Sequence, residues 1–275
     1  MKKGVPSLIK WAGGKKQLLE QFEKFFPEKI ERYFEPFVGG GSVAIYLLKT
    51  HPEIKKIYLS DINKELITVY QIVKDNVEDL IKLLKEYKLK HNKEFYYEVR
   101  AKGIEKLTPL QIATRFIYLN RTCFNGLYRV NSKGQFNVPI GSYKNPTICN
   151  EKDLREISNL LKKDEIKHTQ FYELVKDANK GDFVYFDPPY YPINKTSSFT
   201  TYTKDVFLEK EQEKLAEVFK ELDKRGCKVM LSNSDTDFIK NLYKGYNINF
   251  VKATRMINCD ATKRGSINEI VVTNY

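Results

Sequence analysis

The segment DFVYFDPPYYP (residues 182–192) ends an apolar run with an acid, two prolines and aromatic residues. Prolines and unpaired carboxylates are both unfavourable inside a strand, so we expect a loop that begins at Asp187. Asp187 can accept one hydrogen of a planar amine such as that of adenine, while a carbonyl of the stiff Pro188–Pro189 pair accepts the other. These acceptors favour a pyramidal nitrogen that can attack a methyl group, and Tyr190 offers a face for a stacked base. The pattern predicts an amine clamp, with a plain strand-end turn as the alternative.

A second motif, FEPFVGGGS (residues 34–42), contains a run of three glycines. Glycine lets a backbone approach a ligand closely, and Asp61, at the end of the next expected strand, can accept hydrogen bonds from a ribose. The run lacks the G-x-G-x-x-G spacing of dinucleotide sites, and Glu35 would repel phosphates but attract a cationic amino group. The two features indicate an adenosine-containing cofactor at Gly39. The alternative is a tight turn with Asp61 as a helix N-cap.

Composition narrows the classes of protein that remain. The chain has 275 residues, four scattered cysteines and three histidines, which suggests neither a disulfide framework nor a metal site. We see no apolar run of membrane-spanning or signal-peptide length, and we expect a soluble, cytoplasmic protein. The net charge of +12 favours a polyanionic partner. Many lysines lie on amphipathic stretches such as EDLIKLLKEYKLKHNKEF, however, where a solvated helix surface is the simpler reading.

Short apolar runs alternate with segments of helical period in two parts of the chain, which predicts a wound α/β sheet. The expected strands are 31–37, 55–60, 182–187, 227–232, 247–253 and 268–274. The alternation lapses between about 66 and 170, where helix-like, lysine-rich sequence leads into turn residues and aromatics. We therefore expect a catalytic domain formed by 1–65 and 171–275, with 66–170 as an inserted domain.

Two polar segments have their own expected roles. FNGLYRVNSKGQFNVP (residues 124–139) has an Asn-Gly turn signal and two runs around a second turn, which is typical of a β-hairpin. A two-stranded ribbon can enter the major groove, where Arg and Asn read base edges and an aromatic side chain fills the gap of a displaced base. A purely structural hairpin is the alternative. The segment INKTSSFTTYT (residues 193–203) is expected to close over a flipped base, or else to be a surface loop.

Six segments, in the same order and over nearly the full length, resemble the Dam-type DNA adenine-N6 methyltransferases, most closely the DpnII-type modification methylases. They are LIKWAGGKKQLL, RYFEPFVGGGS, FNGLYRVNSKGQFNVPIGSYKNP, GDFVYFDPPYYP, VMLSNS and EIVVTNY. The resemblance implies a Rossmann-like seven-stranded methyltransferase sheet with a reversed last strand and an inserted target-recognition domain. It also implies S-adenosyl-L-methionine as the cofactor and, as the substrate, adenine flipped out of double-stranded GATC.

The resemblance also assigns residues. The catalytic residues it implies are Asp187, Pro188 and Tyr190; the cofactor-binding residues are Trp11, Lys15, Glu35, Gly39, Asp61, Phe171 and Asp187; and the DNA-binding residues are Lys10, Phe124, Asn125, Leu127, Arg129 and Tyr143. Phe124 would be the wedge and Lys10 would contact a guanine. Trp11 is alternatively a buried anchor, and Lys15 a surface residue. Gln170 stands where the family has an acid and Ser142 where it has an arginine, so one adenine contact and one DNA contact are in doubt.

Two other functions stay open at this point. A methyltransferase acting on cytosine N4 or on a glutamine side-chain amide would use a similar clamp, although Ser or Asn at position 187 would suit these amines better. A DNA-binding protein with an inactive pocket is the alternative from another class, which the intact glycine run, Asp61 and Asp187 disfavour. We expect a monomer that acts on double-stranded DNA, and a cognate restriction endonuclease would be a separate protein.

Overall fold

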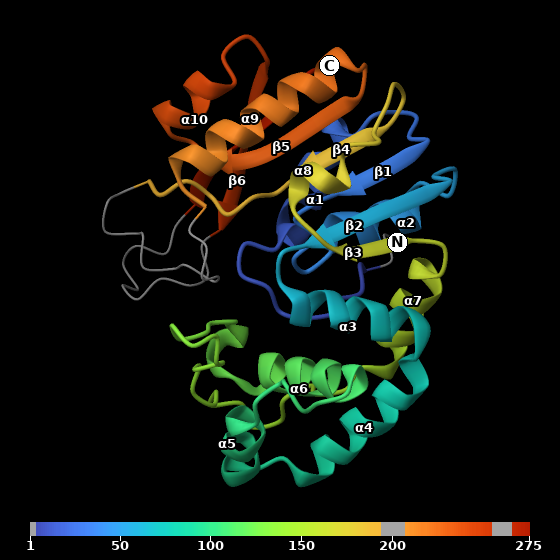
Figure 1. The fold of residues 1–275 in the computed structure, drawn as a ribbon, viewed down its shortest axis with the longest axis vertical. Coiled ribbons are helices and arrows are strands. Elements are labelled where there is room, and N and C mark those ends of the chain that lie inside the picture. Colours follow the sequence, from blue (N-terminus) through green and yellow to red (C-terminus); the bar gives the residue numbers. More distant parts are fainter. Residues whose placement is uncertain (1–3, 194–206, 255–265) are drawn as a thin grey trace.

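A computed structural model describes residues 4–193, 207–254 and 266–275, and its centre is one seven-stranded sheet (Figure 1). The strand order is β3-β2-β1-β4-β5-β7-β6. The strands are β1 Arg32–Glu35, β2 Lys56–Asp61, β3 Glu165–His168, β4 Phe183–Phe186, β5 Lys228–Ser234, β6 Asn247–Thr254 and β7 Ser266–Thr273. β7 runs antiparallel to both neighbours and the other pairs are parallel, so the expected methyltransferase sheet with a reversed last strand is confirmed.

All six strands expected from the sequence are present, but the seventh, β3, was missed. β3 is a four-residue edge strand in which only Ile166 is buried, so its sequence EIKH carries no apolar run. It pairs in parallel with β2, from Tyr58↔Glu165 to Asp61↔His168. The last residues of the 66–170 segment therefore contribute a strand to the sheet. The division of the chain into a catalytic and a target-recognition domain remains a prediction.

The helices are α1 Leu19–Phe22, α2 Ser42–Thr50, α3 Lys64–Asp75, α4 Val77–Lys90, α5 Lys93–Ala101, α6 Pro109–Thr122, α7 Glu151–Leu161, α8 Phe171–Leu174, α9 Glu209–Lys224 and α10 Asp237–Leu242, with short 3-10 turns at Lys15–Leu18, Glu23–Phe25 and Phe124–Gly126. Side-chain caps start several of them. Asn63 accepts the N–H of Leu66 at the start of α3, and Thr108 and Gln111 form a capping box before α6. These local signals explain why the helices begin where they do.

Alternating side chains of the strands divide the apolar core into two layers, as the period of two in a strand requires. Tyr33 and Tyr185 face one layer, which α2 to α7 complete, and Phe34 and Phe186 face the other, which α8, α9 and α10 complete. In Figure 1 the helices α3 to α6 extend the first layer away from the sheet. The segment between β2 and β3 thus shares a continuous core with the sheet, which gives it a defined orientation.

Candidate active site and nucleic-acid interface

Three acids lie at the carboxyl ends of the adjacent parallel strands β2, β1 and β4. Asp61 ends β2, Glu35 ends β1 and Asp187 directly follows β4. Carboxyl ends of parallel strands share one edge of a sheet, which is the usual ligand-binding edge of open α/β sheets. The sheet therefore brings together three of the residues that the sequence predicts for catalysis and cofactor binding.

Lys15 completes this cluster from the N-terminal segment. Its Nζ lies 2.8 Å from Oδ1 of Asp187, donates to the carbonyl of Gly13 at 2.6 Å and lies 4.7 Å from the ring centroid of Tyr190. Only 4% of Lys15 is exposed, so the alternative of a surface lysine is wrong. The Lys15–Asp187 contact is a close ion pair, and the described residues give Oδ1 of Asp187 no other donor. A carboxylate has several acceptor sites, and Lys15 uses only one of them. Asp187 therefore keeps an acceptor for a ligand.

Burial dominates the titration of the acids. It raises the pKa of Asp187 to about 6, against the opposing charge of Lys15. It raises the pKa of Glu35 to about 8, although the hydroxyl of Tyr33 donates to Oε2 of Glu35 at 2.8 Å. Burial also raises the pKa of Asp61, while backbone N–H groups oppose the shift. Acids with shifted pKa values that lie in one cluster are typical of functional sites. A buried carboxyl group such as that of Glu35 can bind a cationic group.

Asp61 joins the glycine run to the start of α3. Its Oδ2 accepts the N–H of Gly39 at 3.1 Å, and its Oδ1 accepts the N–H of Asn63 at 2.9 Å. The side chain that caps α3 is Asn63, so the N-cap alternative for Asp61 is wrong. Gly39 has a φ of +46°, and a Cβ there would lie 2.8 Å from the indole of Trp11. Glycine is thus required both by the backbone conformation and by the packing of Trp11.

Two aromatic residues assigned to cofactor binding pack against other aromatic side chains of the protein, which limits the surface they can offer to a ligand. Trp11 stacks near Phe116 and Tyr128, with ring centroids 6.5 Å and 5.8 Å away, so it anchors the N-terminal segment to the 66–170 segment. Phe171 is 5% exposed and stacks on Phe37 with centroids 5.4 Å apart. Gln170, the residue that departs from the family, is exposed. Trp11 is half-buried, so it anchors the N-terminal segment without being fully enclosed, and its contact with a cofactor stays a prediction.

The loop after Asp187 is held by residues that sequence reasoning missed. The hydroxyl of Tyr190 donates to Oε2 of Glu269 on β7 at 2.7 Å. Gln212, Asn233 and Ser234 bind the backbone of the same loop from α9 and β5. A carboxylate in the apolar run EIVVT was the available signal for Glu269, because such runs are otherwise free of charge. Pro188 is buried, and Tyr190 is half-buried beside Lys15.

The recognition segment contains a short β-hairpin around its second turn, residues 132–134. Around this turn Val130 and Phe136 form an antiparallel bridge, Asn131 donates its N–H to the carbonyl of Gln135 at 2.9 Å, and Asn137 donates its N–H to the carbonyl of Arg129 at 3.0 Å. The pairing is shorter than a regular two-stranded ladder.

The Asn-Gly signal is a turn, in which Asn125 has a φ of 54° and Gly126 a φ of 64°. It follows the end of α6, and the N–H of Gly126 donates to the carbonyl of Cys123 at 3.3 Å. The Asn-Gly turn therefore precedes the hairpin, as the order of the two turns in the sequence predicts.

Most residues assigned to DNA lie on the surface of this segment. Phe124 is 50% exposed and Tyr143 is 37% exposed, which is unusual for large aromatic side chains, while Leu127 is half-buried. Arg129 is exposed, and its Nε donates to the side-chain oxygen of Asn137 at 2.8 Å, a contact that orients the guanidinium. Ser142, which departs from the family, is also exposed.

Lys10 lies against the same surface. Its Nζ is 4.1 Å from the ring centroid of Tyr143. The buried Asn120 accepts the N–H of Lys10 at 2.8 Å and donates to its carbonyl at 2.7 Å and to the carbonyl of Gly126 at 3.1 Å. This one amide therefore ties the N-terminal segment to the turn that carries Phe124 and Asn125. The structure brings Lys10, Tyr143 and the turn together, as the sequence predicts for a common interface.

Comparison with known proteins agrees with this geometry. Residues 11–257 match the family described as D12 class N6 adenine-specific DNA methyltransferase. The chain belongs to this family. It is 47% identical to a type II methyltransferase, M.MjaIII, of Methanocaldococcus jannaschii, over 98% of this chain and 99% of that protein. It is 45% identical to a type II methyltransferase, M1.LlaDCHI, of Lactococcus lactis subsp. cremoris (97% and 94%) and 33% identical to a DNA adenine methylase of Escherichia coli (96% and 94%).

This adenine-specific DNA methyltransferase therefore acts on DNA. Family membership argues against methylation of cytosine N4 or of a glutamine amide, and against a DNA-binding protein with an inactive pocket. Its fold and family imply a methyl donor of the S-adenosylmethionine type. Within the described residues, no helix has the length and apolar character to span a membrane, and no three His, Cys, Asp or Glu side chains converge as metal ligands. The expected closing loop, 193–203, lies outside the described residues beyond Ile193.

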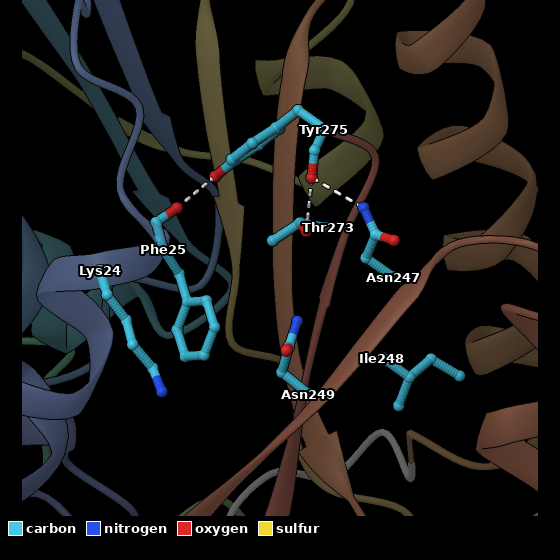
Figure 2. Close-up of a pocket in the computed structure, with 7 residues that line it drawn as sticks. All are labelled: Lys24, Phe25, Asn247, Ile248, Asn249, Thr273 and Tyr275. Atoms are coloured by element: carbon cyan, nitrogen blue, oxygen red, sulfur yellow. Dashed lines mark hydrogen bonds between the residues drawn. The ribbon is translucent and has the colours of Figure 1, made fainter.

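A pocket of about 330 Å³ lies away from the acidic cluster (Figure 2). It is lined by Lys24, Phe25, Asn247, Ile248, Asn249, Thr273 and Tyr275. Asn247 begins β6 and pairs with Thr273 at the end of the reversed strand β7, so this pocket is at the opposite edge of the sheet from Asp187. Its best-defined contact, from the hydroxyl of Tyr275 to the carbonyl of Phe25, joins parts of the chain and involves no acid. We assign no chemistry to it.

Proposed function

We propose that this enzyme transfers the methyl group of S-adenosyl-L-methionine to N6 of adenine in double-stranded GATC, after that adenine has rotated out of the duplex. The observation that carries the proposal is the cluster of Asp187, Lys15 and Tyr190 at the carboxyl end of β4, next to Glu35 and Asp61. A carboxylate with an open acceptor beside an aromatic face suits a stacked base whose amine must be bound.

The residues present fit the proposed cofactor. Asp61 accepts the N–H of Gly39 and keeps further acceptor sites, which would bind the hydroxyl hydrogens of a ribose. Glu35 is 2% exposed and its pKa is raised, so a cationic amino group would stabilise its ionised form. When bound, S-adenosyl-L-methionine supplies an electrophilic methyl group. Trp11, Lys15 and Phe171 would border the same site.

Asp187 and the carbonyl of Pro188 accept the two amine hydrogens of the target adenine in this proposal. Asp187 must be ionised to act as an acceptor only, which its pKa of about 6 allows at neutral pH. Tyr190 presents its ring to the base while its hydroxyl is held by Glu269. The loop that contains them lies against the sheet, so its acceptors are placed before the base arrives.

DNA is proposed to bind over the surface formed by Lys10, Phe124, Asn125, Leu127, Arg129 and Tyr143. The exposed ring of Phe124 would fill the space that the displaced adenine leaves. Arg129 is exposed and uses its Nε to bind Asn137, so its two terminal guanidinium nitrogens would make a bidentate contact to a guanine. Lys10 would contact a second guanine at the edge of the site. We propose that the enzyme acts as a monomer and that any cognate restriction endonuclease is a separate protein.

Methyl transfer to a set of short duplexes tests the proposal. The set contains GATC, each of its single-base variants and a duplex in which the adenine already carries an N6 methyl group. We expect labelled methyl from S-adenosyl-L-methionine to appear as N6-methyladenine in GATC alone. Equal incorporation on GATC and its variants would refute GATC as the recognition sequence. Incorporation into a base other than adenine would refute the proposed clamp on the adenine amine. 2-Aminopurine at the target position should become fluorescent on binding, and an unchanged signal would contradict base flipping.

A further inference from the structure

Three buried polar side chains hold the backbone of the loop that follows Asp187. Gln212 lies on α9, and Asn233 and Ser234 end β5. Gln212 and Asn233 are 0% exposed and Ser234 is 3% exposed. Full burial of two amides is costly unless their hydrogen bonds are made, so the arrangement of their partners reflects a requirement of the fold or of the reaction.

The contacts form one connected network. Nε2 of Gln212 donates to the carbonyl of Pro189 at 2.9 Å, and Oε1 of Gln212 accepts from Nδ2 of Asn233 at 3.0 Å. Oδ1 of Asn233 accepts the backbone N–H groups of Tyr191 at 3.2 Å and of Ser234 at 2.8 Å. The hydroxyl of Ser234 donates to the carbonyl of Tyr191 at 2.7 Å. The loop backbone is thus bound on both sides of Tyr190.

The sequence of the loop explains why side chains do this task. Pro188 and Pro189 have no N–H, so this stretch cannot be held by a strand ladder. The carbonyl of Pro189 accepts from Gln212, which uses one of its two lone pairs to hold the fold. The carbonyl of Pro188 is not part of this network. The side chain of Gln212 therefore holds a structural carbonyl next to the one that can serve the reaction.

We propose that Gln212, supported by Asn233, is a positioning residue for methyl transfer. It holds the Pro189 carbonyl, and through the rigid proline pair it sets the direction of the Pro188 carbonyl and the place of the Tyr190 ring relative to Asp187. Gln212 touches neither the base nor the cofactor in this role. The inference rests on the proposed amine clamp, and it adds the buried residue that sets the geometry of that clamp.

The test compares single-turnover methylation of a GATC duplex by wild type, Gln212→Met and Glu217→Met. Methionine keeps the length of the side chain but has no donor, and Glu217 is an exposed residue of the same helix. A displaced acceptor misaligns the amine, so we expect the rate of Gln212→Met at saturating cofactor and DNA to fall by about 10²-fold. The dissociation constants of both ligands should stay within about twofold of wild type, and Glu217→Met should match wild type.

A single-turnover rate of Gln212→Met within about threefold of wild type would overturn the inference. So would a loss of rate matched by an equal loss of cofactor and DNA affinity, because this marks a general disturbance of the site. If Gln212→Met does not fold, Ser234→Ala removes the hydroxyl that donates to the Tyr191 carbonyl and also lies 3.4 Å from Oδ1 of Asn233. This variant should show the same selective loss of rate, by about 10-fold. Unchanged rates in Ser234→Ala would then refute the network's role.

Asp187→Asn in the same assay separates this inference from the clamp itself. Loss of activity in Asp187→Asn together with a normal rate in Gln212→Met leaves the clamp in place and refutes the positioning role alone. Normal activity in Asp187→Asn refutes the clamp, and the positioning role with it.

Discussion

Replacing Glu35 by glutamine should stabilise the ligand-free enzyme, and the gain should grow with pH. Glu35 is 2% exposed, and burial raises its pKa from 4.5 to about 8. The folded protein therefore holds this proton more tightly than the unfolded chain does. Glutamine has nearly the same shape, and its amide can accept the N–H of Ala44 and donate to the hydroxyl of Tyr33, the two groups that now bond to the carboxyl.

The sign and size follow from proton linkage. Below pH 4.5 the carboxyl is protonated in both states and contributes no pH dependence. Between pH 4.5 and about 8 only the unfolded chain loses the proton, so the free energy of unfolding falls as the pH rises. One pH unit corresponds to about 1.4 kcal/mol. Glu35 therefore lowers the free energy of unfolding by up to about 3 kcal/mol at pH 7 and by about 5 kcal/mol above pH 8. Glu35→Gln should recover up to these amounts.

Urea unfolding at intervals from pH 5 to pH 9 measures this difference, with the fluorescence of Trp11, the single tryptophan of the chain, as the signal. Glu31→Gln is the control, because Glu31 is a 68% exposed acid paired with Lys55 at 3.7 Å. Its effect on stability should be small and nearly independent of pH. A stability difference between Glu35→Gln and wild type that is constant over the whole range would refute the reasoning, since it would mean that Glu35 does not titrate there.

Three further predictions concern activity and binding. The rate of wild type should fall as the pH drops through about 6, because protonation turns Asp187 into a donor, and Asp187→Asn should be severely impaired at every pH in single-turnover assays. Asp61→Ala should weaken S-adenosyl-L-methionine binding by about 1–3 kcal/mol in calorimetry, while NAD should not bind. Arg129→Ala should cost about 1–3 kcal/mol of discrimination at one base pair of GATC. Lys133 is exposed in the turn that follows Arg129, and Lys133→Ala should weaken binding to all sequences alike and reduce its salt dependence.

Each of these has a result that would contradict it. A flat pH profile below 7, or Asp187→Asn within about threefold of wild type, removes Asp187 from the mechanism. An unchanged cofactor affinity in Asp61→Ala would mean that Asp61 does not bind the cofactor and has only a structural role, through its hydrogen bonds to Gly39 and Asn63. If Arg129→Ala lowers methylation of every variant site by one factor at matched salt, Arg129 contacts the backbone or is structural, and another residue reads the base.

The sequence by itself determined six of the seven strands, the glycine turn and the Asp187 loop, because these depend on local chemistry. Apolar runs bounded by turn residues mark buried parallel strands, and two prolines after an acid end a strand in any context. The strand order β2-β1-β4 and the parallel pairings, which the structure supplies, then place Asp61, Glu35 and Asp187 at one edge. The family resemblance supplied the expected identity of the substrate and of the cofactor, which composition and periodicity alone do not specify.

Only the tertiary structure decided which side chains surround these residues. The edge strand β3 has too little apolar sequence to be recognised, and it forms because β2 offers it a partner. Lys15 reads as an ordinary surface lysine until folding buries it against Asp187. Gln212 lies in a charged helical sequence, and Glu269 is distant in sequence from Tyr190. Their contacts join residues far apart in the chain, and local patterns cannot specify such pairs because burial is set by the packing of whole elements.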